Sequence, residues 1–361
     1  MTTVSDIEYM AHAIRLAKLG LNHASPNPSV GCVLVKGGKV IGEGYTQLGG
    51  VPHAEVNAIQ NAGASVSGCT AYVTLEPCSH QGKSPPCSLA LMQAGVHRVV
   101  VAMTDPNPLV NGEGIKQLRA AGIDVDLGVL ETQARGVNPG FNKRMSFGMP
   151  KLTAKLAMSL DGRSAMASGE SQWITGSEAR DDVQRLRARS CAIVTGIDTV
   201  INDNAVLTVR KYGDRQPLRL ILDSRLRLPV DAKILQQAGD TFIAYVCDDN
   251  NRAQQLETAG AQLVQMPEDN SRVDLQAVMR WLAEHQCNEV LLECGPRLAG
   301  AMIQMQLIDE IIVYMAPILM GSNARPLLDL PLEKMSDKVQ LDIGEVRAVG
   351  DDLRVTLKPA Y

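Results

Sequence analysis

The chain has few aromatic residues, no long apolar run and no surplus of basic charge. Phe, Trp and Tyr make up 3% of its 361 residues, and the formal net charge is -4. This balance argues against a general nucleic-acid-binding surface, although it leaves room for a local pocket that binds one phosphate. The longest apolar runs, such as Ile311–Met315, fall far below the ~18 residues of a membrane span.

Signals for export are also lacking. Residues 1–6 do not show a basic segment followed by an apolar one, as a signal peptide would. The eight cysteines are too widely spread for a disulfide scaffold. We therefore expect a cytoplasmic protein in which most cysteines, Cys32 and Cys69 among them, pack as small apolar side chains.

The length and the local patterns predict two α/β domains. Single cores stop growing at about 250–300 residues, and a junction near Pro150 divides the chain into residues 1–147 and 150–361. In both parts, segments with helical spacing of apolar residues alternate with short apolar runs typical of strands. Layered α/β domains have this order of elements.

The expected elements can be given as residue ranges. The first domain should contain helices over 6–19, 53–62, 88–94 and 113–121, and strands over 30–35, 40–44, 70–75, 99–103 and 125–129. The second should contain helices over 177–189, 251–259, 275–284 and 298–306, and strands over 152–158, 192–195, 218–222, 242–246, 262–266, 290–293 and 311–314. Ser5 or Asp6 could cap the first helix.

Three residues of the first domain form a candidate zinc site. His53 precedes a predicted helix, Cys78 follows a predicted strand, and Cys87 stands at the start of another helix. One imidazole and two thiolates leave the fourth tetrahedral position of zinc open for water, which indicates a catalytic rather than a structural site. Zinc lowers the pKa of such a water towards ~7.

Glu55 lies two residues after His53 and supplies an acid/base group. A carboxylate beside the water can take its proton and pass it to a ring nitrogen and then to departing ammonia. His-x-Glu, then Pro-Cys, then Cys is the order of zinc deaminases, although eight residues separate the two cysteines here instead of two. The alternative is a structural zinc with a fourth ligand such as His80.

Three further residues are candidates for substrate contact in the first domain. Asn27 stands between two prolines, in a rigid loop that could aim its amide at a ring or a ribose. His80 and Lys83 lie between the two cysteines, in a segment that must border the metal, and either could bind a substrate phosphate. The alternative for all three is a solvated loop side chain.

The second domain offers a weaker signal. A predicted strand runs into Gly295, Pro296 and Arg297 and then into a helix, and a glycine-led helix start offers free amides to a phosphate. An ordinary strand-to-helix turn would look the same. No G-x-G-x-x-G is present, which counts against a Rossmann site.

Longer motifs cover almost the whole chain. The first domain contains SPNPSVGCVLV (25–35), HAE (53–55), EPCSHQGKSPPC (76–87), DPNP (105–108) and NPGFNKR (138–144). The second contains KLAMSLDG (155–162), SQWIT (171–175), NDNAVLTVR (202–210) and LECG (292–295). Together these motifs resemble the bifunctional deaminase–reductases of riboflavin biosynthesis, a family marked by the insertion between the two cysteines.

The resemblance implies a fold, an activity and partners. It implies a cytidine-deaminase-like three-layer domain followed by a dihydrofolate-reductase-like α/β domain. The first would deaminate diaminohydroxyphosphoribosylaminopyrimidine by zinc-dependent hydrolysis, and the second would reduce the ribosyl side chain to ribityl with NADPH. The partner would be this phosphoribosyl pyrimidine, without nucleic acid or membrane, and the family is usually dimeric or larger.

The resemblance also assigns residues of the reductase domain. Those placed near the cofactor are Ala157, Trp173, Thr199, Asp203, Ser224, Gly295, Pro296, Arg297, Leu298, Ala299, Gly300 and Ala301. Those placed near the substrate are Ser171, Arg187, Leu207, Arg210 and Glu293, and Lys155 could hydrogen-bond a substrate carbonyl or hydroxyl. Arg187 and Arg210 could hold the substrate phosphate through paired hydrogen bonds. Asp203 or Glu293 could orient the ribose hydroxyls or handle a proton as the ring opens.

Two other functions compete with this one. The first domain could deaminate free nucleosides or tRNA with the second as a binding module, but the low basic charge and the insertion argue against tRNA. The chain could also be a non-catalytic zinc protein whose second domain mediates assembly, but a structural zinc has no use for Glu55.

Overall fold

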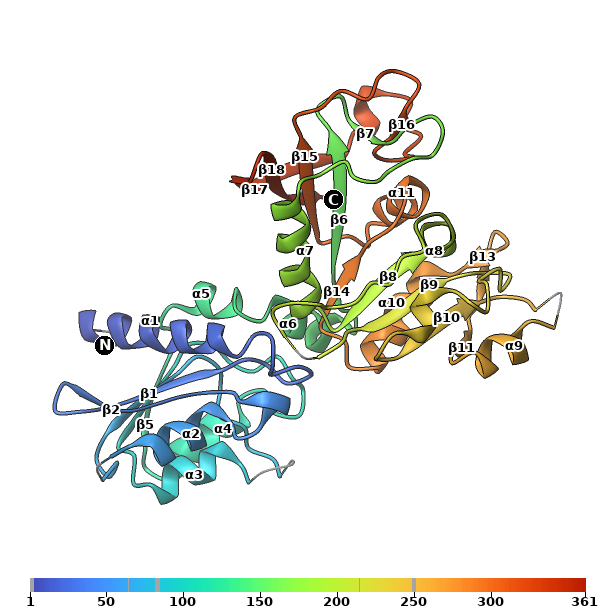
Figure 1. Cartoon of the computed structure of the whole chain (residues 1–361). Coiled ribbons are helices and arrows are strands. Elements are labelled where there is room, and N and C mark those ends of the chain that lie inside the picture. Colours follow the sequence, from blue (N-terminus) through green and yellow to red (C-terminus); the bar gives the residue numbers. More distant parts are fainter. Residues whose placement is uncertain (1–2, 64, 82–84, 214, 249–250) are drawn as a thin grey trace. The chain divides into compact units, whose positions relative to one another are not determined.

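The chain divides into two compact units, Met1–Met149 and Pro150–Tyr361 (Figure 1). The structure is a computed structural model that describes residues 3–63, 65–81, 85–213, 215–248 and 251–361. No helix within these ranges is long and apolar enough to cross a membrane.

The first unit is built around a five-stranded sheet with the order β2-β1-β3-β4-β5. β1 pairs antiparallel with β2 and β3, whereas β3, β4 and β5 are parallel. The strands are β1 (Gly31–Lys36), β2 (Lys39–Tyr45), β3 (Thr70–Val73), β4 (Arg98–Val101) and β5 (Asp124–Leu127). The helices are α1 (Val4–Leu19), α2 (Ala54–Asn61), α3 (Cys87–Gln93), α4 (Glu113–Ala120), α5 (Glu131–Arg135) and α6 (Pro139–Phe147).

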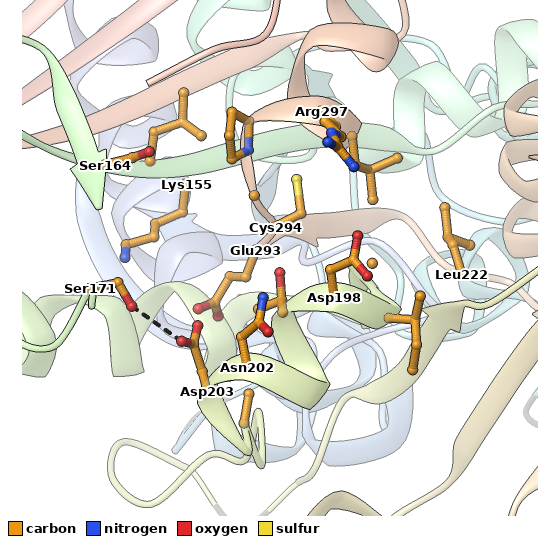
Figure 2. Close-up of a pocket in the computed structure, with 18 of the residues that line it drawn as sticks. Lys155, Ser164, Ser171, Asp198, Asn202, Asp203, Leu222, Glu293, Cys294 and Arg297 are labelled. Atoms are coloured by element: carbon orange, nitrogen blue, oxygen red, sulfur yellow. Dashed lines mark hydrogen bonds between the residues drawn. The ribbon is translucent and has the colours of Figure 1, made fainter. Parts of the chain in front are cut away.

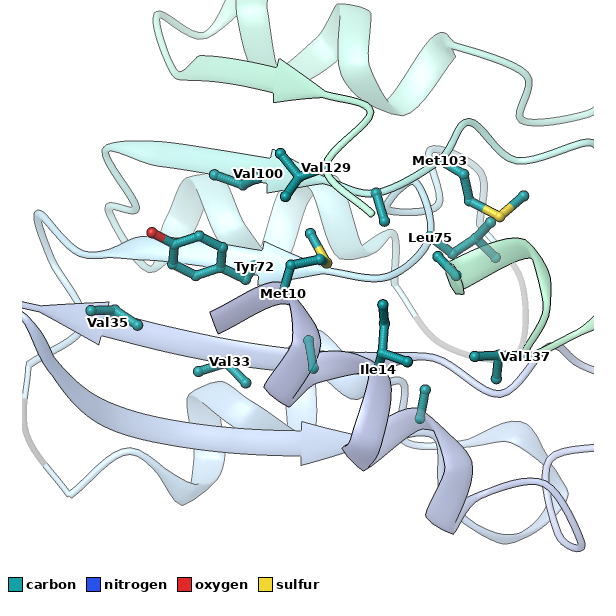
Figure 3. Close-up of a cluster of buried hydrophobic side chains, with 14 of the residues drawn as sticks. Met10, Ile14, Val33, Val35, Tyr72, Leu75, Val100, Met103, Val129 and Val137 are labelled. Carbon is teal, nitrogen blue, oxygen red and sulfur yellow. The ribbon is translucent and has the colours of Figure 1, made fainter. Parts of the chain in front are cut away.

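Helices cover both faces of this sheet because its strands direct apolar side chains alternately to two cores. Val33 and Val35 of β1 pack with residues of α1, α5 and α6 in the cluster that Figure 3 shows. Cys32 and Leu34 of the same strand pack with residues of α2, α3 and α4. The unit is therefore three-layered, and Cys32 and Cys69 are buried as predicted.

The first helix begins earlier than the sequence predicted, because Thr3 and not Ser5 or Asp6 is its N-cap. The Thr3 hydroxyl accepts the Asp6 amide, and the Asp6 carboxylate accepts the Thr3 amide in return. This buried carboxylate also accepts hydrogen bonds from Tyr72 at 2.8 Å and Arg98 at 2.8 Å. The Arg98 hydrogen bond is the main reason that the pKa of Asp6 lies well below its usual range.

Asp6→Asn should lower the free energy of unfolding of the first unit by about 1–3 kcal/mol near neutral pH. Because the folded-state pKa of Asp6 is depressed, its contribution is complete above the ordinary value of 3.8 and is lost as the pH falls below it. Urea titrations followed by circular dichroism should therefore show a smaller gap between variant and unaltered chain in acid. An equal gap at both pH values would contradict this linkage. Both tryptophans, Trp173 and Trp281, lie in the second unit, so their fluorescence transition should not move.

The second unit is built around a nine-stranded sheet with the order β11-β10-β9-β8-β14-β6-β15-β18-β17. Neighbours from β11 to β15 are parallel, and β18 and β17 extend the sheet as an antiparallel hairpin. These strands are β6 (Lys151–Ser159), β8 (Ala192–Gly196), β9 (Leu218–Leu222), β10 (Thr241–Tyr245), β11 (Gln262–Gln265), β14 (Glu289–Leu292), β15 (Glu310–Ala316), β17 (Gln340–Val349) and β18 (Asp352–Ala360).

Helices and two small ladders complete the second unit. The helices are α7 (Ser177–Arg189), α8 (Ile197–Asp203), α9 (Ala253–Thr258), α10 (Leu275–Glu284) and α11 (Pro296–Gln304). The ladders pair β7 (Arg163–Ala165) with β16 (Arg325–Pro326), and β12 (Glu268–Asp269) with β13 (Arg272–Val273). Because parallel strands share their carboxyl edge, the segments that follow β8, β9 and β14 meet there, where open α/β sheets bind ligands.

One buried carboxylate fixes α7 on one face of the β17–β18 hairpin. Asp182 accepts hydrogen bonds from Tyr314 at 2.7 Å, Arg347 at 2.9 Å and Arg354 at 3.2 Å. Arg347 and Arg354 are opposite each other in the ladder, so they point to the same face of the hairpin. The residues next to them along each strand point to the opposite face.

Candidate active sites

The three predicted metal ligands of the first unit converge. His53 directly precedes α2, Cys78 follows β3, and Cys87 is the first residue of α3. Their ligand atoms all lie within 4.8 Å of one another, and His53 Nδ1 is 3.0 Å from Cys87 Sγ and 3.5 Å from Cys78 Sγ. One ring nitrogen and two sulfurs are the donors that zinc prefers, and three of them leave a fourth tetrahedral position open. This donor set fits zinc.

The surroundings of Cys78 favour its thiolate, which is the form that binds a metal. A hydrogen bond from the Cys87 thiol, aided by His53, lowers the pKa of Cys78 to about 4. The Cys87 backbone amide, at the start of α3, also points at Cys78 Sγ from 3.3 Å. The same thiol–thiolate hydrogen bond raises the pKa of Cys87, so the two sulfurs share one proton until a dication displaces it.

Glu55 lies beside these ligands without being one of them. Its side chain is buried in the first turn of α2 and is in hydrogen-bond contact with the Cys87 thiol. Burial, followed by the charge of Cys78, raises the pKa of Glu55 to about 7. The carboxyl group is therefore placed to exchange a proton with a molecule held at the open metal position.

A glycine on β2 determines how closely α2 can approach the sheet. A Cβ atom on Gly44 would lie 2.3 Å from the carbonyl oxygen of Ala54, so only glycine permits this contact. Because α2 begins at Ala54, the same contact positions His53 before the helix and Glu55 within its first turn.

Glu76 has a role that the sequence did not reveal. Its buried carboxylate accepts four backbone amides, those of Asp105 and Gly112 on one oxygen and of Gly114 and Ile115 on the other, at 2.9–3.2 Å. Glu76 thus ties the start of α4 to the strand end that leads into Cys78. The sequence signal that could have indicated this role is the position of an acidic residue between a buried strand and the Pro77-Cys78 pair.

The residues predicted to contact the substrate in the first unit are not part of the metal-ligand cluster. Asn27 lies in the Pro-rich loop and points at Gly50, whose backbone oxygen is 3.5 Å from its amide nitrogen. Gly50 has a φ of +86°, and a Cβ atom on it would lie 1.9 Å from the amide nitrogen of Asn27. Only a glycine therefore leaves room for the Asn27 side chain. His80 is exposed, and Lys83 lies outside the described residues.

The second unit contains a cavity of about 1770 Å³ at the carboxyl edge of its parallel strands. Figure 2 shows Lys155, Glu293 and Ser171 toward one side of this cavity and Leu222, the last residue of β9, at the other. Ligand pockets usually occupy about 300–1,000 Å³. The cavity is therefore large enough to hold two ligands together.

A largely buried charge cluster forms part of the cavity wall. Arg187 of α7 makes a two-pronged ion pair with Glu293 at 2.6 and 2.9 Å and donates to the carbonyl of Thr208 at 3.1 Å. Burial opposes the charge on Glu293, but Arg187 keeps its pKa below the usual value. Burial also lowers the pKa of Lys155, against the attraction of Glu293. Protein groups thus engage three of the five N–H donors of Arg187, which also lines the cavity where the substrate phosphate is expected.

Almost all the residues predicted for the reductase line this one cavity. They are Lys155, Ala157, Ser171, Trp173, Arg187, Thr199, Asp203, Leu207, Arg210, Ser224, Glu293, Gly295, Pro296, Arg297, Leu298 and Ala301. Ala299 and Gly300 are buried in α11 and do not line it. Ser171 donates to Asp203 at 3.1 Å, and the Arg210 amide donates to Gln184 at 2.9 Å.

The start of α11 fits a coenzyme phosphate. Gly295 is the N-cap and Pro296 the first helical residue, so the following amides have no partner within the helix. A Cβ on Gly295 would meet nothing within 4 Å, which leaves the approach to these amides open. Free amides and the positive end of the helix attract phosphate. The donor set and the size of the cavity therefore suit a dinucleotide.

Comparison with known proteins gives the family. Residues 3–103 match the cytidine and deoxycytidylate deaminase zinc-binding region, and residues 150–355 match the RibD C-terminal domain. The riboflavin biosynthesis protein RibD of Escherichia coli is 48% identical over 364 residues, which cover 97% of this chain and 98% of that protein. The chain belongs to the RibD family.

Solved RibD structures agree with this assignment. Form 1 of Acinetobacter baumannii RibD matches with a TM-score of 0.92 and 45% identity over 99% of both chains. The deaminase/reductase of Thermotoga maritima matches with a TM-score of 0.88 and 30% identity, again over 99% of both chains. As a RibD protein, the chain is an enzyme of riboflavin biosynthesis with a zinc-dependent deaminase domain and an NADPH-dependent reductase domain.

Proposed function

We propose that the chain deaminates diaminohydroxyphosphoribosylaminopyrimidine in residues 1–147 and reduces the deaminated product in residues 150–361. The observation that carries this proposal is that one chain contains both a three-ligand metal cluster with Glu55 beside it and a large cavity with a buried Lys155–Glu293–Arg187 cluster. The solved relative from Thermotoga maritima is described as a deaminase and reductase for this substrate pair.

In the first step, His53, Cys78 and Cys87 would hold the zinc. When bound, zinc polarises a water so that it can attack the ring carbon bearing the amine. Glu55 takes a proton from the attacking water and gives it to the ring nitrogen. It then takes the proton of the newly added hydroxyl and gives it to the amine, so that the C–N bond breaks, a carbonyl forms and ammonia leaves. Asn27, His80 and Lys83 would contact the ribose and phosphate of the substrate.

In the second step, the residues of the cavity orient the ribosyl side chain. When bound, NADPH supplies the reducing equivalents. Lys155 hydrogen-bonds a carbonyl or hydroxyl of the substrate, and Arg210 holds its phosphate. Glu293, fixed in place by Arg187, is positioned to handle the proton that reaches the ribose oxygen as the ring opens. Ser171 and Asp203, which bind each other, would orient the ribose hydroxyls.

The experiment that tests this proposal follows NADPH absorbance after addition of the diamino-pyrimidine ribotide. The unaltered chain should release ammonia and oxidise NADPH. Glu55→Gln should lose deamination by about 10²–10⁴-fold and should oxidise NADPH only when given the deaminated product. Zinc content should stay stoichiometric in this variant, which separates a catalytic from a structural metal. Ammonia release without NADPH oxidation would refute the reductase part.

We also propose a cytoplasmic location and a homodimer. All eight cysteines are free thiols, and Cys78 and Cys87 must stay reduced to bind zinc. The dimer would form through the outer hairpin of the reductase sheet. Six apolar side chains paired across β17 and β18 share the face away from Asp182: Ile343, Val346, Ala348, Leu353, Val355 and Leu357.

This apolar face is open in the single chain. Ile343 is 70% exposed and Val346 is 55% exposed. Contiguous apolar patches on a surface mark interaction sites, and a second copy offers a patch of the same composition for a two-fold symmetric contact.

Ile343→Glu combined with Val346→Glu should convert the dimer into a monomer, because it would bury four like charges at the symmetric contact. Sedimentation velocity should report the change. Gln340→Glu, on the other face of the same strand, is the matched control and should leave the dimer intact. A monomeric unaltered chain, or a dimer that survives both charges, would show that this face is not the interface.

A further inference from the structure

The segment 207–212 lies between α8 and β9 and belongs to no helix or strand. Two of its residues, Leu207 and Arg210, line the reductase cavity. Leu207 at its start and Tyr212 at its end have φ values of +50° and +71°, which residues other than glycine rarely adopt. A segment with such a backbone at both ends keeps its shape only when the surrounding structure holds it.

The side chain of Gln216 pairs with this segment as a neighbouring strand would. Its Oε1 accepts the Val209 amide at 2.9 Å, and its Nε2 donates to the Val209 carbonyl at 2.8 Å. Val209 is only 5% exposed, so its two backbone groups need partners within the protein. One side-chain amide supplies both of them and thereby fixes the orientation of the backbone at Val209.

Helix α7 holds the next three residues of the segment. Gln184 is buried, and its Oε1 accepts the Arg210 amide at 2.9 Å. Asp181, one turn earlier on the same face of the helix, accepts Lys211 Nζ at 2.5 Å and also the Tyr212 hydroxyl. The backbone of Arg210 is therefore held by Gln184 directly and by Gln216 and Asp181 through its neighbours.

These contacts hold the backbone of Arg210 and leave its guanidinium group available. The Arg210 side chain is exposed at the cavity, and no hydrogen bond or ion pair joins it to another described residue. Arg187, in contrast, is engaged by Glu293 and Thr208. Ordering a long side chain on a mobile backbone would add to the cost of binding, so a fixed backbone makes Arg210 a better phosphate ligand.

We propose that Gln184 and Gln216 are positioning residues of the reductase, which fix the backbone of Val209 and Arg210 so that the Arg210 guanidinium group is presented to the substrate phosphate. This inference rests on the proposed function, in which Arg210 binds that phosphate. Gln216 is not among the residues that line the cavity, so an effect of Gln216 on substrate binding has to pass through the segment 207–212.

The test measures the steady-state kinetics of the full chain with saturating NADPH and the deaminated product as the varied substrate. Gln216→Met keeps the length of the side chain and removes both hydrogen bonds. It should raise KM by about 3–30-fold and leave kcat within about twofold, as expected when binding common to ground and transition state is lost. Gln184→Met should act in the same way. The affinity for NADPH, measured by fluorescence titration, should not change in either variant.

A double-mutant cycle tests whether the glutamines act through Arg210. Arg210→Ala alone should raise KM by about 10–100-fold, and adding Gln216→Met to it should raise KM no further. Ser190→Ala is the matched control, because it removes a buried side-chain hydrogen bond at the end of α7, 2.8 Å long to the Leu186 carbonyl. That control should leave KM unchanged.

Three results would overturn the inference and leave the reductase function in place. They are an unchanged KM in both glutamine variants, a fall in kcat and NADPH affinity as large as the rise in KM, and fully additive effects of Gln216→Met and Arg210→Ala. An unaltered chain that does not oxidise NADPH with the deaminated product would overturn both the inference and the proposed reductase function.

Discussion

Cys78→Ser is expected to abolish zinc binding and deamination while leaving the reduction of deaminated substrate within about twofold of its normal rate. Cys78 is one of the three metal donors found among the described residues, and it is the sulfur that its neighbours hold as a thiolate. A serine hydroxyl stays protonated and cannot replace it. The reductase cavity belongs to a separate compact unit and contains none of the three ligands.

The measurement has two parts, metal content by atomic absorption and separate assays of ammonia release and NADPH oxidation. Cys69→Ala is the control, because Cys69 is a buried thiol of the same unit that takes no part in the ligand cluster. That variant should retain its zinc and most of its deaminase activity. Equal loss of both activities in Cys78→Ser would mean that the two sites are not independent.

Glu293→Gln should lower both the folding stability of the second unit and its rate of NADPH oxidation. The substitution leaves Arg187 buried without its counter-charge, and breaking such a pair costs about 3–5 kcal/mol. Lys155 also loses the carboxylate that raises its pKa, so its burial lowers that pKa further. We expect NADPH oxidation with deaminated substrate to fall by about 10²–10⁴-fold, as when a positioned proton-transfer group is removed.

A second substitution separates the two effects. Arg187→Gln combined with Glu293→Gln removes both charges, so much of the lost stability should return while the activity stays low. Tryptophan fluorescence reports the stability directly, since Trp173 and Trp281 are both in the second unit. Glu284→Gln, at the exposed end of α10, is the neutral control. Full activity in Glu293→Gln would exclude Glu293 from the chemistry.

The metal site could be predicted from the sequence because each ligand lies at the boundary of an element. His53 precedes a helix, Cys78 follows a strand, and Cys87 begins a helix. Because such boundaries can be predicted from local sequence patterns, the positions of the three ligands could be predicted as well. The role of Glu76 could not be predicted in this way. Its partners are backbone amides of residues 105–115. Nearly every residue type has a backbone amide, so the sequence does not show which residues donate to Glu76.

The reductase site depended far more on resemblance than on pattern. Its cavity gathers residues from many elements, and a pair such as Arg187 and Glu293 is separated by 106 residues, half of the domain. The strand 218–222 and the helices 177–189 and 275–284 were predicted with their observed bounds, because each is a continuous periodic segment. The β17–β18 hairpin was missed, since the bulge near Gly344 interrupts the alternation of β17 and hides its partner.

The position of β6 has a consequence for synthesis of the chain. This strand is the first of the reductase sheet to leave the ribosome, yet its two neighbours are β14 and β15, which are made near the end of translation. Pairing of such high contact order is slow. The deaminase unit, whose contacts are complete by residue 149, can fold before β14 and β15 are synthesised and can pair with β6. Truncation between the end of β6 and the start of β15 should therefore yield a folded deaminase attached to an open, aggregation-prone sheet.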